Sequence, residues 1–161
     1  MNWYTIGLYL KKLSTMKNLL AIVFCFSAMS FTIWQPDFDT AKQTAKTHHQ
    51  LILLNFSGSD WCGPCMRMQK EIFENKTFTG MADSILVMVN ADFPRNKKHQ
   101  LAKNITKQNE KLADQYNPQG KFPFTVLLDS NGKIIKSWDG LPTQNAAEFA
   151  KQIKTIADAR K

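Results

Sequence analysis

The chain has 161 residues, a length that suits one domain, and a formal net charge of +8 at pH 7. Lys11, Lys12 and Lys17 lie in the first thirty residues, which contain no acidic side chain. The other basic residues are scattered among acids and form no basic stripe with interleaved aromatic residues, which argues against a nucleic-acid-binding protein. The positive excess is typical of a solvated surface.

Residues 16–30 have the layout of a secretory signal peptide. A short basic start at Lys17 is followed by an apolar core, and small residues then lead to Ser30. Cleavage after Ser30 would leave a mature protein that begins near Phe31. The segment would then direct the rest of the chain out of the cytoplasm, to a bacterial periplasm or its equivalent.

We therefore predict a natural start at Met16, a signal peptide within residues 1–30 and a single exported domain over residues 31–161. The uncharged stretch of residues 18–36 is also just long enough to span a bilayer. An uncleaved membrane anchor is thus the alternative. Both alternatives place the domain on the exported side.

Apolar runs and capping residues predict the first half of the domain. Asp37 and Asp39 can cap a short helix that ends near His49. Residues 51–56 and 85–91 are continuous apolar runs, as in strands buried on both faces. Between them we expect one helix, with Met66, Ile72 and Phe73 directed inward, and a short connection to the second strand. This is the pattern of a βαβ unit.

The second half of the domain is predicted to form a helix, a β-hairpin and a final helix. Residues 94–120 are polar with apolar residues at helical spacing, which predicts an amphipathic helix that includes Leu101 and Tyr116. Strands at 124–129 and 133–138 are joined by an Asn-Gly step, a strong hairpin signal. Thr143 is the expected cap of the last helix. The order of elements predicts an α/β fold in three layers, a central mixed sheet with helices on both faces.

Cys62 and Cys65 are the only cysteines outside the predicted signal peptide. They follow an apolar strand and open a helix, which places Cys62 at the positive end of a helix dipole, where a thiolate is stabilised. Cys65 lies on the same helical face, within reach to resolve a mixed disulfide. Gly63 leaves room for a partner's backbone, and Pro64 suits the first helical turn. The pattern predicts a redox-active disulfide and no other cofactor.

Two other interpretations of this pair stay open. A structural disulfide across two residues would remove little chain entropy and would therefore stabilise the fold weakly. A zinc site needs two further ligands, and His48, His49 and His99 form no second paired motif, so we predict no metal. His99 lies in a polar region with no evident partner.

The run from Trp61 to Cys65, the Phe122-Pro123 step and the closing hairpin and helix resemble the thioredoxin family. The lead-in from Gly58 is similar to exported thioredoxin-like and thiol:disulfide interchange proteins. The resemblance covers about residues 37–160 and implies a thioredoxin-like fold.

By this resemblance Cys62 is the attacking thiolate, exposed enough to react, and Cys65 is the shielded resolving thiol. Pro123 matches the family's cis-proline, which leaves the backbone of Phe122 free to pair with a substrate strand. Trp61 would be an apolar rim for partner contact.

One position departs from the family. Asn55 stands where the family usually has a buried aspartate that helps to take the proton from the resolving thiol, and an amide cannot titrate. We expect Asp60 or water to assist instead.

The expected function is that of an exported thiol-disulfide oxidoreductase acting on protein cysteines. The Gly63-Pro64 pair resembles that of reducing members, so we predict a reductant. A disulfide oxidase or isomerase is the alternative, as is a redox-inactive binding module or chaperone that uses Trp61 and Phe122 as an apolar patch. Expected partners are protein thiols and disulfides and an upstream electron donor, such as a membrane disulfide reductase. We expect a monomer and no nucleic-acid partner.

Overall fold

The computed structural model describes residues 34–160. In chain order its elements are α2 (Phe38–His48), β1 (Leu51–Ser57), α3 (Gly63–Met68), the π-helical turn η1 (Gln69–Phe73), α4 (Lys76–Ile85), β2 (Leu86–Asp92), the 3-10 turn η2 (Lys97–His99), α5 (Lys103–Tyr116), β3 (Phe124–Leu128), β4 (Ile134–Asp139) and α6 (Ala146–Asp158). The predicted signal peptide, its cleavage site and the alternative anchor fall largely or wholly outside these residues. No helix in the described part combines the length and apolar character needed to cross a membrane.

The four strands form one mixed sheet in the order β2-β1-β3-β4. β1 pairs with β2 in parallel, while β3 pairs with β1 and with β4 in antiparallel fashion. Because β1 is central, its apolar residues from Ile52 onward are buried, in agreement with the continuous apolar run in the sequence. The predicted hairpin between β3 and β4 is confirmed, and Gly132 supplies the positive φ of 86° that its turn needs.

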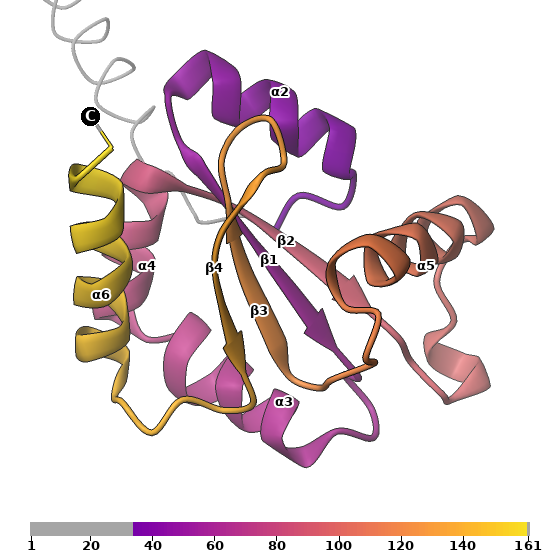
Figure 1. The fold of residues 1–161 in the computed structure, drawn as a ribbon. Helices are drawn as coiled ribbons and strands as arrows, with labels where there is room; N and C mark the ends of the chain where they lie inside the picture. The colour runs from indigo at the N-terminus through magenta and orange to yellow at the C-terminus, as the bar shows by residue number, and fades with distance from the viewer. Residues whose placement is uncertain (1–33, 161) are drawn as a thin grey trace, which may run out of the picture. The chain divides into compact units, whose positions relative to one another are not determined.

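Alternation along β1 divides the core into two halves. Ile52, Leu54 and Phe56 pack against α2 and α5, whereas Leu53 packs against α3, α4 and α6. Figure 1 shows the resulting three layers, with the sheet between the two groups of helices. The predicted three-layer α/β fold is confirmed. By the same alternation Asn55 lies on the side of α3, beneath the cysteine motif.

The chain between η1 and β2 contains a helix that the sequence interpretation missed. A short connection was expected, but residues Lys76–Ile85 form α4, capped by Asn75, whose side chain accepts from the Thr77 amide at 3.0 Å. Only Phe78 and Ala82 of this helix are buried. The apolar face of α4 is therefore narrow, and the exposed Gly80 in the middle of this helix further lowers its helix propensity.

The inward face of the motif helix also differs from the prediction. Met66 was expected to point inward, but it is 49% exposed, while Met68 is fully buried. Cys65, Met68 and Ile72 occupy positions i, i+3 and i+7 of one stripe, and Met66 lies about 100° around the helix from Cys65. Ile72 and Phe73 are buried as predicted.

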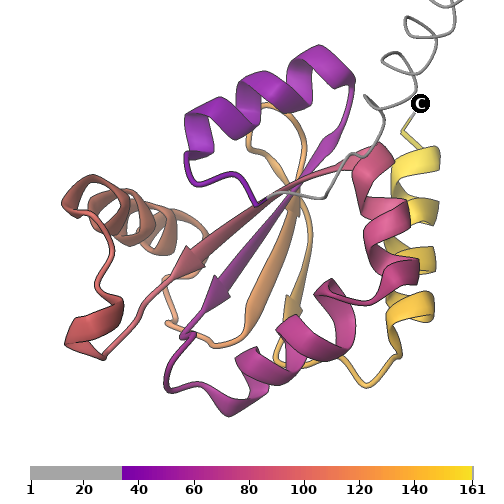
Figure 2. The same ribbon diagram turned by 180° about the vertical axis from the view of Figure 1, so that it is seen from behind.

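Two helix starts were predicted at the wrong residue. The amphipathic helix α5 begins at Lys103 rather than near residue 94, because a loop and η2 come first; the view from behind in Figure 2 shows this segment on the same side of the molecule as α5. Asn145, not Thr143, caps α6, since Asn145 Oδ1 accepts from the Glu148 amide and Glu148 accepts in return from the Asn145 amide. Asp37 is confirmed as the cap of α2.

Candidate active site

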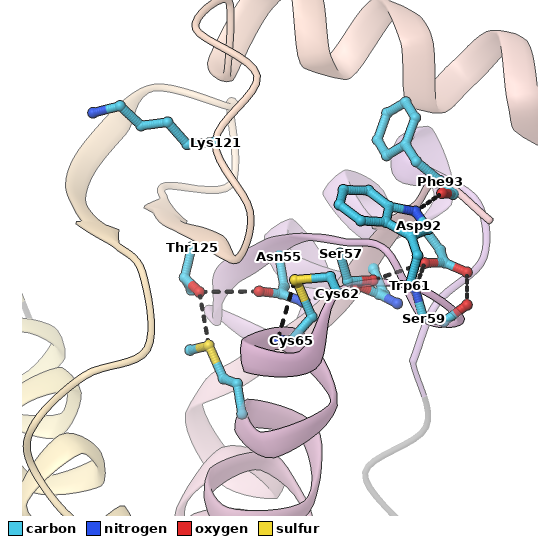
Figure 3. Close-up of a disulfide and its surroundings, with 12 residues drawn as sticks. Asn55, Ser57, Ser59, Trp61, Cys62, Cys65, Asp92, Phe93, Lys121 and Thr125 are labelled. Carbon is cyan, nitrogen blue, oxygen red and sulfur yellow. Dashed lines mark hydrogen bonds between the residues drawn. A yellow bond between two sulfur atoms is a disulfide. The ribbon is translucent and has the colours of Figure 1, made fainter. Parts of the chain in front are cut away.

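The two cysteines lie at the start of α3, the helix that follows β1 in the chain. Cys62 is the N-cap of α3, and its Sγ accepts a hydrogen bond from the backbone N–H of Cys65 at 3.2 Å. Pro64 occupies the first turn, where its missing N–H leaves no intrahelical bond unmade. A disulfide joins Cys62 and Cys65, with their Cα atoms 5.2 Å apart (Figure 3). The N–H groups at this helix start can stabilise negative charge on the Cys62 sulfur.

Exposure does not separate the roles of the two cysteines. We expected an exposed Cys62 beside a shielded Cys65, but each is only 5% exposed in the disulfide form. What differs is their place in the helix, because only Cys62 caps it and receives an N–H at its sulfur. The assignment of Cys62 as the attacking thiol therefore depends on the helix terminus.

Behind the cysteines, three polar side chains from three strands form a neutral hydrogen-bonded row. Thr125 Oγ1 donates to Asn55 Oδ1 at 3.1 Å, and Asn55 Nδ2 donates to Asn90 Oδ1 at 3.0 Å. The sheet register sets this row, since Asn55 is paired with Asn90 on β2 and with Thr125 on β3. Asn55 is 4% exposed, and both ends of its amide have partners. The position holds no proton acceptor that could titrate.

Cys65 also borders a cavity of about 520 Å³ with Asn55, Ser57 and Asn90 in its lining. A space of this size with several polar walls can hold water molecules. The sequence analysis expected Asp60 or water to accept the proton of Cys65, and this cavity gives water a place next to Cys65.

Asp60 is not among the residues that line this cavity. Its carboxylate accepts from the backbone N–H groups of Arg95 at 2.9 Å and Asn96 at 2.8 Å, and it contacts His99 Nδ1 at 3.2 Å. The two backbone hydrogen bonds, joined by His99, lower the pKa of Asp60 against the opposing effect of burial. Asp60 thus fixes the segment that follows β2. The expectation that His99 has no partner is wrong, and a proton-transfer role for Asp60 stays a prediction without a contact to support it.

Trp61 lies in an aromatic cluster beside the cysteines. Its Nε1 donates to the carbonyl oxygen of Phe93 at 2.7 Å, and its ring centroid lies 5.3 Å from that of Phe122, edge to face. The guanidinium carbon of Arg95 lies 3.9 Å from the centroid of the indole. Gly58 makes room for this arrangement, because a Cβ there would come within 2.2 Å of the Trp61 ring.

Asp92, at the end of β2, accepts hydrogen bonds from the loop between β1 and α3 that leads to Cys62. The sequence analysis did not identify this residue. Its carboxylate accepts from Ser59 N at 2.8 Å and from Ser59 Oγ at 2.5 Å, and Ser57 Oγ lies 3.0 Å from it (Figure 3). The pairing of Ser57 with Asp92 in the parallel β1–β2 register brings these groups together. An acid that directly follows a predicted buried strand is the signal that could have identified it.

The Phe122–Pro123 peptide bond is cis, in agreement with the resemblance. Pro123 is buried and its carbonyl oxygen accepts from Gly140 N at 2.9 Å, while Phe122 is half-buried and contacts Trp61 and Phe93. The structure thus places Phe122 against the residue that precedes Cys62. Gly63 is exposed, and a Cβ added there would meet nothing within 4 Å, so the surface beside Cys62 is open at that point. Substrate binding by these residues stays a prediction.

Residues 34–160 contain no group of three His, Cys, Asp or Glu side chains arranged to hold a metal ion. A dithiol at a helix start, next to an apolar rim, can exchange with the disulfide of another molecule.

Comparison with known proteins agrees with this geometry. The sequence model of the family described as "Thioredoxin-like domain" matches residues 38–157. The disulfide bond reductase DsbH of Chlamydia pneumoniae is 36% identical over 127 residues, which are 79% of this chain and 74% of that protein. The thioredoxin-related protein DsbJ of the same organism is 31% identical over 103 residues, 64% of this chain but only 29% of that protein. A solved structure described as DsbH oxidoreductase shares 29% identity and a TM-score of 0.72, covering 81% of this chain and 88% of that one. The chain therefore belongs to the thioredoxin-like domain family and is a thiol-disulfide oxidoreductase of the Dsb type.

Proposed function

We propose that this protein is an exported reductant of protein disulfides, with Cys62 as the attacking thiol and Cys65 as the resolving thiol. The observation that carries the proposal is the position of Cys62 at the N-cap of α3, where its sulfur accepts the Cys65 N–H. The start of a helix stabilises a thiolate at that position.

The proposed reaction has two exchange steps. The Cys62 thiolate attacks a client disulfide, a Cys62–client disulfide forms, and the released client sulfur leaves as a thiolate that takes up a proton. Cys65 then loses its proton and attacks the Cys62 sulfur. The Cys62–Cys65 disulfide forms and the second client sulfur leaves with the electron pair. Two electrons have passed from the protein's dithiol to the client, and an upstream donor, such as a membrane disulfide reductase, must return them.

The residues around Cys65 determine how it loses its proton in the second step. Asn55 is neutral and Asp60 is bound to the segment after β2, so water in the cavity beside Cys65 is the proposed acceptor. Trp61 and Phe122 would form the apolar contact for the client chain beside the cysteines.

Support for the reducing direction comes from the Gly63-Pro64 pair and from the relative named a disulfide bond reductase. Equilibration of the Cys62–Cys65 couple with glutathione measures this directly. We expect a potential of about −270 mV, the value for thioredoxin; a potential of about −120 mV would indicate a disulfide oxidase instead.

The roles of the two cysteines are tested by trapping. A Cys65→Ser variant should attack through Cys62 and then stall, because a hydroxyl cannot complete the exchange, and it should accumulate client complexes that survive denaturation and dissolve on reduction. Cys62→Ser is the matched control and should form none. Rapid alkylation of the reduced protein, followed by peptide mapping, should label Cys62 first.

Two results would contradict the proposal. Faster labelling of Cys65 would reverse the assigned roles. If Cys65→Ser traps no client and the wild-type protein also fails to reduce insulin, the protein is not a reductant of protein disulfides, and the disulfide oxidase or isomerase alternative replaces that proposal.

A further inference from the structure

A basic segment is hydrogen-bonded to the loop that precedes Cys62. The chain between β2 and α5 carries Arg95, Lys97 and Lys98, which we call the basic rim, and all three are exposed. The Asp60 carboxylate holds the backbone of this segment by the two N–H hydrogen bonds described above and by its contact with His99. Since Asp60 is two residues before Cys62, the rim is anchored to the loop that presents the attacking sulfur.

Arg95 also borders the apolar contact surface. Its guanidinium stacks over the Trp61 indole at 3.9 Å from the ring centroid, and the same indole contacts Phe122 edge to face. A chain that approaches the cysteines along Trp61 and Phe122 therefore meets positive charge at the edge of the aromatic cluster.

Within the described part of the chain the side chains of the basic rim have no ion-pair partner. Lys42, Arg67, Lys121 and Lys154 each have a carboxylate partner within 4.0 Å, whereas no such ion pair is found there for Arg95, Lys97 or Lys98. Residues 93–100 contain no acid, and Asp60 offsets at most one of the three charges. An exposed cluster of like charge raises the local concentration of oppositely charged partners and their rate of association.

We propose that the basic rim selects clients whose reactive disulfide is flanked by acidic residues. The proposal rests on the proposed function, because it names a substrate class for the same site. Acidic side chains next to the client's cysteine would lie against Arg95, Lys97 and Lys98 while the cysteine reaches Cys62. Since the rim is exposed, the preference should act mainly on association and should weaken when salt screens the charges.

Three peptides test the proposal. They share one disulfide-bonded pair of cysteines and differ only in flanking residues, which are aspartates, serines or lysines. With the reduced wild-type protein at low salt, kcat/KM should be about tenfold higher for the aspartate peptide than for the lysine peptide, and this ratio should approach one when salt is raised.

Matched variants separate the rim from net charge. Lys97→Gln/Lys98→Gln removes two rim charges without touching Trp61, and Lys46→Gln/Lys151→Gln removes two exposed charges on α2 and α6. The ratio of kcat/KM should fall several-fold in the first variant and stay near the wild-type value in the second. Arg95→Gln should lower it as well. Because the readout is a ratio, a general loss of activity does not change it.

The proposal is overturned if the wild-type ratio is near one at low salt, or if the rim and control variants lower it equally. Failure of the proposed direction gives a different result, since then none of the three peptides is reduced. In that case the ratio of kcat/KM for the aspartate and lysine peptides is measured with the disulfide form of the protein and the dithiol form of the peptides. The same outcomes then support or overturn the proposed selection by the basic rim.

Discussion

Gly58→Ala tests how the position of Trp61 is maintained. A Cβ at residue 58 would lie 2.2 Å from Trp61 Cε2 and 2.5 Å from Trp61 Nε1, well inside van der Waals contact. The indole is rigid and can respond only by rotating about its side-chain torsions. Rotation separates Nε1 from the Phe93 carbonyl oxygen and removes the ring from Phe122 and Arg95.

The size of the effect follows from these three contacts. Loss of the hydrogen bond costs about 1 kcal/mol, loss of the edge-to-face contact about 0.5–1.5 kcal/mol and loss of the Arg95 contact about 0.5–1 kcal/mol. An alanine also restricts the unfolded chain, which offsets about 0.4–1 kcal/mol. We therefore expect the free energy of unfolding to fall by about 2 kcal/mol.

Denaturant unfolding measures the loss, and tryptophan fluorescence of the folded protein reports the movement of the indole. Gly80→Ala is the matched control, because Gly80 lies within α4 and a Cβ there meets nothing within 4 Å. That variant should gain about 0.5–1 kcal/mol from the better helix propensity of alanine. If Gly58→Ala changes the unfolding free energy by less than about 0.5 kcal/mol and leaves the fluorescence unaltered, Gly58 does not govern the position of Trp61.

Three further predictions concern single side chains. Asn55→Asp places a carboxyl in a buried neutral row, where burial raises its pKa, so the variant should be less stable than wild type at neutral pH by about 1–3 kcal/mol and should recover as the pH falls through that pKa. In stopped-flow measurements the same variant should speed the attack of Cys65 on the mixed disulfide. An unchanged rate would mean that residue 55 takes no part in removing the proton from Cys65. Because the pKa of Asp60 is lowered in the folded protein, its contribution to stability is present above the carboxyl pKa of the unfolded chain and is lost as the pH falls through the folded-state pKa. The difference in unfolding free energy between wild type and Asp60→Asn should therefore shrink in acid. Parallel curves of unfolding free energy against pH for the two proteins would contradict this. Asn145→Ala should cost about 1 kcal/mol by removing a helix cap, whereas Thr143→Ala, measured by the same denaturant unfolding, should cost much less.

Strong local patterns made the sheet and the motif predictable. β1 and β2 are long apolar runs, and a run of this kind has few alternatives to a buried strand between two helical layers. The spacing of Cys62 and Cys65 after such a run led to the helix start and to the dithiol chemistry.

Features that depend on long-range contacts were missed. The pairing of His99 with Asp60 joins residues 39 positions apart, and no local pattern indicates it. The helix α4 buries only two residues, too few to give a clear periodicity. The cap of α6 was placed at Thr143 because threonine caps well in general, but only Asn145 has a glutamate three residues later to complete the reciprocal bond.

The neutral row behind the cysteines has a consequence for kinetic measurements. Asn55, Asn90 and Thr125 keep one charge state at every pH that a folded protein meets, and the first ionisable group that the hydrogen bonds reach is Asp92, through Ser57 at the end of the strand. A buried acid beside a thiol titrates together with it, and the apparent constants then belong to the pair. In this protein the pH profile of disulfide exchange should instead report the two cysteines, coupled to each other but to no buried acid in this row, which makes the chain a simple system in which to measure how far a helix terminus acidifies a dithiol.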